Sequence, residues 1–140
     1  MSFLQADARL SDEALQAMLL ASIGKAHALG IPECIVIVDS SCVDLLSFRM
    51  ASAKIMSLET ARAKAITAAS NRSPSGGIPA AFAPAVAAAT HGHVTNLQGG
   101  LPIQIDGYHL GGIGVGSGTP DEDLAVAQAA LAVVGAITFD

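Results

Sequence analysis

The stretch LPIQIDGYHLGGIGV, residues 101–115, indicates the fold more strongly than any other part of the chain. It holds two strand-like runs, 101–105 and 108–115, with only Asp106-Gly107 between them. Because both residues of this pair tolerate a positive φ, they suit the type I′ turn of a tight β-hairpin. The stretch therefore predicts two antiparallel strands.

Helix signals follow this hairpin. Thr119 is a suitable N-cap, Pro120 takes the first helical position and Glu122 completes a capping box. The uncharged stretch 124–139 continues the pattern and is shorter than a membrane span requires. We expect a helix that begins after Thr119 and, through this stretch, is buried.

A second hairpin is predicted nearer the N-terminus. Residues 12–29 have acidic residues at their start and apolar residues at helical spacing, and Gly30 ends the pattern. The β-branched run 34–38 and the returning run 43–48 follow as strands. A helix and a hairpin are therefore expected in the first third of the chain.

The middle of the chain connects the two hairpins. Residues 57–70 predict a helix in which Lys64 lies among alanines on one face. Residues 71–79 are rich in Ser, Gly and Pro and predict a loop, and residues 80–90 predict a short alanine helix interrupted by Pro84. The complete order predicts a single α+β domain over residues 1–140, an antiparallel sheet with its helices packed against it.

Composition narrows the classes of function. The chain has 140 residues, of which 51% are hydrophobic and 14% charged, against roughly a quarter charged in an average domain. So few charges predict a homo-oligomer that buries alanine-rich surfaces between subunits. The net charge of −5 without a basic cluster argues against nucleic-acid binding.

The segment 1–9 and the two cysteines bear on location. The segment has no positive residue before Arg9 and no long apolar run, which disfavours a cleaved signal peptide and favours a cytoplasmic protein. We expect no membrane association. Cys34 and Cys42 have no metal-type spacing and are expected to be buried or half-buried free thiols.

Several short motifs occur in an order that resembles a known family. They are Ile37-Val38-Asp39, Arg49-Met50, the Lys64–Ala68 segment, Gly99–Ile103, Asp106-Gly107, the glycines of 111–118 and the segment 121–127. Together they resemble the GlcG/HbpS family, which includes the C-terminal domain of PduO-type proteins, over residues 11–132. The resemblance implies a profilin-like fold and oligomers such as octamers. It also implies a ligand such as haem or a corrinoid-related compound in some members, and a link to small-molecule catabolism in others.

The sequence departs from this family in two places. The turn after the first strand of such proteins is usually glycine-rich, whereas here it is Ser40-Ser41-Cys42-Val43-Asp44. Arg49-Met50 is commonly followed by Asp-Gly, whereas here Ala51-Ser52 follows. The first change predicts a different turn geometry, and the second removes a carboxylate from beside the expected site.

Lys64 and Arg49 are the main cationic candidates. A lysine on an alanine face loses hydration unless an anion meets it, so Lys64 either takes part in a site, reaches water, or pairs with a nearby Asp. Arg49 has the planar fork that suits a ligand carboxylate, or it forms a structural pair with Asp39 or Glu59. Arg62, three residues after Glu59, is expected to form an exposed ion pair within the helix.

The histidines supply the candidate proton-transfer and axial-ligand groups. His91 and His93 flank Gly92 and can converge on one ligand if the segment is extended, although two exposed loop histidines are the simpler interpretation. His109 follows Tyr108 on a strand, and His27 is expected to face solvent. By chemistry alone His91, His93 and His109 could ligate haem iron.

The glycine-rich segment before the last helix is a further candidate. Its spacing lacks the order of a phosphate-binding P-loop. Gly116-Ser117-Gly118 leads into a helix whose free amides could bind an anion, or it forms only a tight turn. The full set of candidate ligand-binding residues is Arg49, Lys64, Thr67, Gly99, Gly100, His109, Gly116 and Ser117.

Three classes of function remain open. The first is an oligomeric protein that binds an anionic small molecule such as haem, a corrinoid-related compound or a carboxylate metabolite. The alternative is a cofactor-free isomerase, hydratase or lyase acting on a small oxo acid, in which Arg49 holds the carboxylate, Lys64 acts at the carbonyl and His91 or His93 moves the proton. The third is an interaction-only protein.

Overall fold

The computed structural model describes residues 2–139, and its centre is one antiparallel sheet of four strands. The strands pair in the spatial order β2-β1-β4-β3, so β1 and β4 join two hairpins. Asp106 has a φ of 52° and Gly107 of 81°, which confirms the positive-φ turn between β3 and β4. The strands are β1 (Cys34–Asp39), β2 (Asp44–Arg49), β3 (Gly100–Ile105) and β4 (Tyr108–Gly116).

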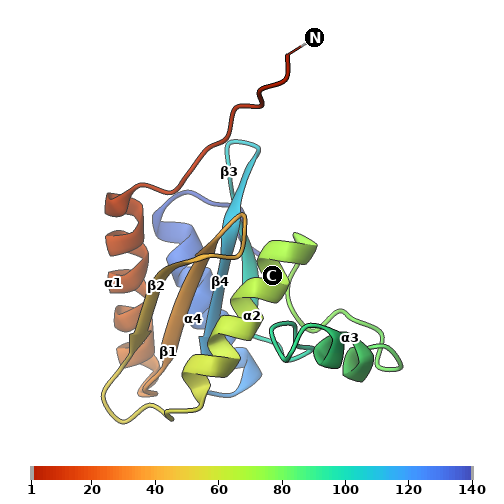
Figure 1. Cartoon of the computed structure of the whole chain (residues 1–140). Coiled ribbons are helices and arrows are strands. Elements are labelled where there is room, and N and C mark those ends of the chain that lie inside the picture. The colour runs from red at the N-terminus through yellow and green to blue at the C-terminus, as the bar shows by residue number, and fades with distance from the viewer. Residues whose placement is uncertain (1, 140) are drawn as a thin grey trace.

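Helices cover both faces of this sheet. Three of them, α1, α2 and α4, pack on it, whereas α3 projects from the body (Figure 1). α1 and α4 lie together on one face and α2 lies alone on the other (Figure 1). The α+β class and the single sheet with packed helices are therefore confirmed. The helices are α1 (Asp12–Leu29), α2 (Ser57–Asn71), α3 (Ala83–Ala89) and α4 (Pro120–Val133).

The face toward α1 and α4 carries large side chains, and we call it the branched face. Alternation along each strand sends every second residue to this side. Its side chains are buried with Met18 of α1 and Leu131 of α4 in one cluster. The branched face consists of Ile35, Ile37, Leu101, Ile103, Ile113 and Val115.

The face toward α2 carries Val36 and Val38 on β1 but glycines at four positions of β3 and β4, and we call Gly100, Gly112, Gly114 and Gly116 the glycine face. A Cβ at Gly114 would lie 1.9 Å from the carbonyl oxygen of Ala61, and one at Gly112 would lie 2.4 Å from that of Ala65. The helix backbone thus rests almost directly on the strand backbone. The alanines of α2 fit there because they add little volume.

The β1–β2 turn contains no glycine and is held by a side chain, and two other local details differ from the sequence-based expectations. In the β1–β2 turn Asp39 Oδ1 accepts hydrogen bonds from the backbone N–H groups of Ser41 and Val43, and the register shifts between Ile37 and Val38. This side-chain acceptor replaces the conformational freedom that a glycine-rich turn would supply. The last helix ends at Val133 instead of continuing through residue 139.

The short alanine helix, the second difference, begins later than expected. α3 starts at Ala83, so Pro84 lies in its first turn, where the missing N–H costs nothing, and does not interrupt it. None of the residues of α3 is buried. Its base is fixed by Asn96, whose side chain exchanges two hydrogen bonds of 2.9 Å with the backbone of Ile78.

Two further expectations concern the thiols and the membrane. Cys34 is buried and Cys42 is half-buried, and both are free thiols as expected. Among residues 2–139 no helix combines the length and hydropathy needed to cross a bilayer.

Candidate functional site

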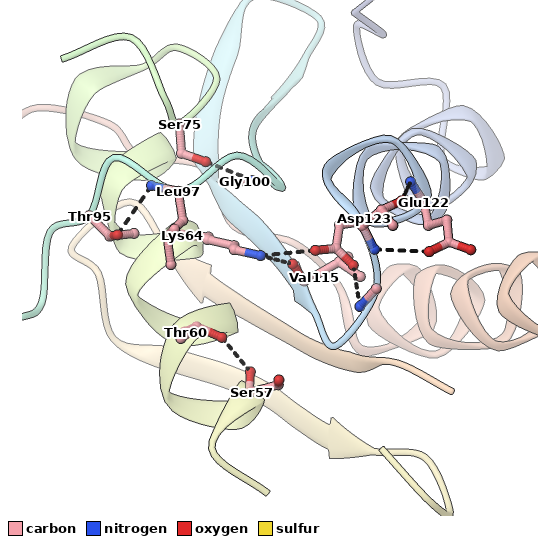
Figure 2. A network of polar contacts seen from close by, with 12 residues as sticks. Ser57, Thr60, Lys64, Ser75, Thr95, Leu97, Gly100, Val115, Glu122 and Asp123 are labelled. Carbon is pink, nitrogen blue, oxygen red and sulfur yellow. Dashed lines mark hydrogen bonds and ion pairs between the residues drawn. The ribbon is translucent and has the colours of Figure 1, made fainter. Parts of the chain in front are cut away.

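Lys64 lies inside the protein, between the two layers of helices. Its side chain leaves α2 and is 7% exposed. Nζ donates hydrogen bonds to the carbonyl of Val115 at 2.8 Å and to Asp123 Oδ2 of α4 at 3.0 Å (Figure 2). Of the alternatives for Lys64, pairing with an aspartate is therefore the arrangement present in the structure.

The amides at the start of α4 are also satisfied by the protein. The N–H of Gly118 donates to Asp123 Oδ1 at 3.0 Å, and the N–H of Thr119 donates to Glu122 Oε1 at 2.9 Å. The capping box predicted from Thr119 and Glu122 is confirmed. An anion at this helix terminus would have to displace two carboxylates of the chain itself.

A second buried acid, Glu33, lies near Asp123. Glu33 is fully buried, and neither carboxyl oxygen has a hydrogen-bond partner within the described residues 2–139. Burial is the largest cause that raises the pKa of Glu33 to about 9, followed by hydrogen bonding to Asp123 in the protonated form and by the charges of Asp123 and Glu122. The interior therefore holds two acids around Lys64.

Arg49 is placed apart from this cluster. It is exposed on β2, and its guanidinium donates to the carbonyl of Ala53 at 3.0 Å. Lys64, by contrast, is buried and bonded to Asp123 and to the carbonyl of Val115. The structure therefore does not assemble these two cations around one ligand.

The candidate glycines and hydroxyls serve the packing of α2 and its neighbours. Gly100 and Gly116 are buried on the glycine face, and a Cβ at Gly99 would lie 2.7 Å from the carbonyl of Val115. Thr67 Oγ1 donates to the carbonyl of Ala63 and accepts from the N–H of Thr95. Ser117 Oγ accepts from the N–H of Lys54 at 3.1 Å.

Two of the predicted histidines, His91 and His93, line one cavity beside the outer side of α2, although both are exposed, as the simpler interpretation expected, and lie in a turn instead of an extended segment. The cavity there has a volume of about 380 Å³, and we call it the histidine pocket. The chain returns from α3 through His91, with a φ of 55°, and Gly92, with a φ of 79°, which brings the loop back toward α2. The pocket is lined by Glu59, Arg62, Ala63, His91, Gly92 and His93.

Arg62 is the cation among the lining residues of this pocket, and Glu59 is the acid. Arg62 does not pair with Glu59, as the helical spacing suggested, but with Asp44 of β2: Nη1 donates to Oδ1 at 2.9 Å, and Nη2 contacts Oδ2. Arg62 pairs with Asp44 because two guanidinium nitrogens can contact both oxygens of this carboxylate at once, which is the arrangement that guanidinium and carboxylate groups prefer. Two donors are used in this pair, and the remaining N–H groups of the guanidinium are available to a ligand.

His109 lies in a different place. Its Nε2 is 2.8 Å from the carbonyl of Ala69, so this nitrogen carries the proton. Burial lowers the pKa of His109, which favours the neutral ring. It lines a separate cavity of about 380 Å³ together with Arg72 and residues 5–7, so the three candidate histidines do not converge.

A metal centre is not built from the usual ligands. Within residues 2–139 no group of three or more His, Cys, Asp or Glu side chains is placed to hold a metal ion. His91 and His93 supply two imidazoles, and a third ligand would have to come with the bound molecule or from another chain.

The sequence interpretation missed Asp123, Glu33 and the role of Arg62. Asp123 precedes Val126, Ala127 and Ala130 by three, four and seven positions, which is the spacing of one buried helical face. An acid on such a face needs a partner, and Lys64 among alanines needed one too. Matching these two needs would have found the ion pair from the sequence.

Comparisons with known proteins agree on one family. The family model described as "Haem degrading protein HbpS-like" matches residues 10–132. A crystal structure of HbpS is 30% identical, covers 95% of each chain and has a TM-score of 0.83. A PduOC–heme complex is 27% identical, covers 95% of this chain and all of the other, and has a TM-score of 0.86.

A curated relative is longer than this chain. The corrinoid adenosyltransferase PduO of Citrobacter freundii is 29% identical over 134 residues, which is 92% of this chain and 40% of that protein. The chain thus spans about two-fifths of the length of this relative. The match is to one part of a larger enzyme.

Proposed function

The chain belongs to the HbpS-like family, and on that basis we propose that it binds haem, or a comparable anionic small molecule, in the histidine pocket. The observation that supports this most is that His91, His93 and Arg62 line the same cavity. Imidazole nitrogens are common axial ligands of haem iron, and a guanidinium fits a propionate. A solved relative in complex with heme, with a TM-score of 0.86, supports the choice of ligand class.

The residues present fit part of what haem requires. His91 or His93 would hold the iron, and Arg62 would hold a propionate while still paired with Asp44. Haem supplies a ligand-binding and redox-active iron when bound. Ala63 is the only hydrophobic residue among those that line the pocket within residues 2–139, so one chain offers little apolar wall for the macrocycle.

A second copy of the chain would complete the pocket, and we extend the proposal to a homo-oligomer. α3 and the preceding residues 77–82 carry no charged side chain, and Phe82 is 62% exposed. A helix of seven residues is too short to be stable by itself in water and needs packing. Docking of this projecting segment against another subunit would bury it and add apolar surface near His91.

Titration with haem tests the ligand. Purified protein without haem is titrated with haem, and the Soret band is followed. We expect a saturable shift in the wild type. In His91→Ala/His93→Ala the affinity should fall by about tenfold or more, since one lost contact of about 1.4 kcal/mol has that effect. His27→Ala, an exposed histidine outside the pocket, is the matched control and should bind like the wild type.

The possible outcomes test the identity of the ligand and the position of its binding site separately. Absence of a saturable shift in the wild type would refute haem as the ligand. Unchanged binding by the double variant would move the site away from the histidine pocket. Sedimentation at micromolar concentration tests the oligomer, and a clean monomer would remove that part of the proposal.

The alternative of catalysis on an oxo acid receives no comparable support. It requires Lys64 and Arg49 to face one substrate, and Lys64 is buried against Asp123 and Val115 while Arg49 lies exposed on β2. The adenosyltransferase activity named for PduO is likewise no part of the proposal, because the chain spans about two-fifths of that protein.

A further inference from the structure

Glu33 is a buried acid that the proposed function does not use. It directly precedes β1 and has no exposed surface. Its backbone is fixed by Met50, whose N–H donates to the carbonyl of Glu33 at 3.0 Å and whose sulfur lies 3.4 Å from the N–H of Glu33. The carboxyl group is therefore shielded from water in the folded protein.

The carboxyl groups of Glu33 and Asp123 reach the same small space beside Gly118. A Cβ at Gly118 would lie 2.5 Å from Glu33 Oε1 and 2.9 Å from Asp123 Oδ1. Only the absence of a side chain at residue 118 leaves room for both oxygens. Two ionised carboxylates are both acceptors, so in that form no hydrogen bond can join them.

The charges around Glu33 do not compensate a second carboxylate. From α2 comes Lys64, which is already bonded to Asp123 Oδ2. From α4 come Asp123 and Glu122, both acids. The titratable neighbour on β1 is the buried thiol of Cys34, and the guanidinium of Arg49 on β2 acts on that thiol.

We propose that Glu33 is a carboxylic acid in the folded protein and donates its proton to Asp123, forming a proton-dependent latch between the start of β1 and the first turn of α4. The proton converts a pair of acceptors into a donor and an acceptor. Asp123 then receives hydrogen bonds from Lys64, from the N–H of Gly118 and from Glu33. One buried carboxylate thus connects α2, the β4–α4 turn and β1.

The latch gives the fold a definite dependence on pH. Burial and Asp123 raise the pKa of Glu33 from 4.5 to about 9, so folding takes up a proton at any pH between these values. A group whose pKa rises on folding stabilises the fold most below its unfolded pKa. That contribution is lost as the pH rises from about 4.5 to about 9. Above this range Glu33 ionises beside Asp123 and the latch opens.

The substitution Glu33→Gln tests the proposal, because the amide is neutral and can still donate to Asp123 at every pH. Urea unfolding of the wild type and the variant is compared from pH 5 to pH 9. The ratio of the wild-type to the variant unfolding constant should rise with pH, by up to about tenfold per unit. Glu13→Gln, at an exposed glutamate of α1, is the matched control and should leave the wild-type slope unchanged. A ratio for Glu33→Gln that stays constant with pH would overturn the latch.

A second measurement needs only the wild type and covers a variant that fails to fold. Glutamate labelled with carbon-13 at the side-chain carboxyl gives four such signals, from residues 13, 33, 59 and 122. We expect one of them to titrate near pH 9. Titration of all four below about pH 6 would contradict the proposal, because no glutamate would then hold a proton at neutral pH.

Discussion

The two faces of the sheet pack their helices in opposite ways. On the branched face, Ile113 and Val115 fill the space under α1 and α4 with large side chains. On the glycine face, Gly112 and Gly114 of the same strand bring α2 to backbone contact. Along β4, branched residues therefore alternate with glycines. A different kind of substitution is expected to destabilise the packing on each face.

This contrast also bears on where a ligand can bind. The glycines that suggested a ligand site from the sequence are covered by α2, so they allow the helix to pack closely on the strands. The open cavity lined by His91 and His93 lies on the outer side of α2. Added volume on the glycine face should therefore damage the fold first, whereas changes at the histidine pocket should alter binding with little effect on stability.

The largest effect is expected from Gly114→Ala. A new Cβ would lie 1.9 Å from the carbonyl oxygen of Ala61, and backbone cannot yield as a flexible side chain can. We expect a loss of at least about 3 kcal/mol in the free energy of unfolding, measured with urea. Gly24→Ala in α1, with nothing within 4 Å, is the control and should stabilise the protein by about 0.5–1 kcal/mol. A Gly114→Ala variant as stable as the wild type would refute direct backbone contact.

Lys64→Met should have the next largest effect. The substitution keeps apolar length but leaves the carboxylate of Asp123 buried without its cation. Breaking such a pair costs about 3–5 kcal/mol, again measured by urea unfolding. The double variant Lys64→Met/Asp123→Asn should recover part of the loss, because no unpaired charge remains and the amide oxygen can still accept from the N–H of Gly118. If the double variant is less stable than Lys64→Met, charge burial is not the cause.

A smaller effect is expected on the branched face from Ile113→Val. Removal of one buried methylene group leaves a small cavity beneath α1 and α4 and should cost about 0.5–1.5 kcal/mol. The four residues of the glycine face have no side chain that could be shortened in the same way. A change of less than about 0.3 kcal/mol would indicate that Ile113 is not closely packed.

The smallest effect on stability is expected from Arg62→Ala. Its ion pair with Asp44 is partly exposed, with side-chain exposures of 45% and 34%, so its loss should cost less than about 1 kcal/mol. Haem affinity should fall nonetheless, because a propionate would lose its cation. Titration of the Soret band and urea unfolding of the same sample separate the two effects. Unchanged affinity would exclude Arg62 from the site.

The architecture could be predicted from the sequence because its signals are local. Asp106-Gly107 fixes one turn, and Thr119, Pro120 and Glu122 fix the start of α4 through contacts within a few residues. The end of α4 was placed too late, since the apolar pattern continues past Val133 although the chain turns at Gly135, with a φ of 70°. Composition alone does not mark that point.

The candidate site was harder to predict because it depends on distant contacts. His91 and His93 were candidates because of their own spacing. Arg62, however, pairs with Asp44 of β2, 18 positions away, and not with Glu59. Lys64 and Asp123 lie 59 positions apart in the chain. Which cation meets which acid is decided by how α2 packs against β2 and α4, and a single sequence carries no direct signal of that packing.

A map of amide chemical shifts on addition of zinc protoporphyrin, a diamagnetic analogue of haem, tests the central claim that the ligand binds on the outer side of α2. The account predicts saturable shifts at Glu59, Arg62 and residues 91–93, with the glycine-face residues Gly100 and Gly116 unchanged. Shifts centred on Gly99, Gly100 and Gly116 instead would place the ligand between α2 and the sheet and contradict the account.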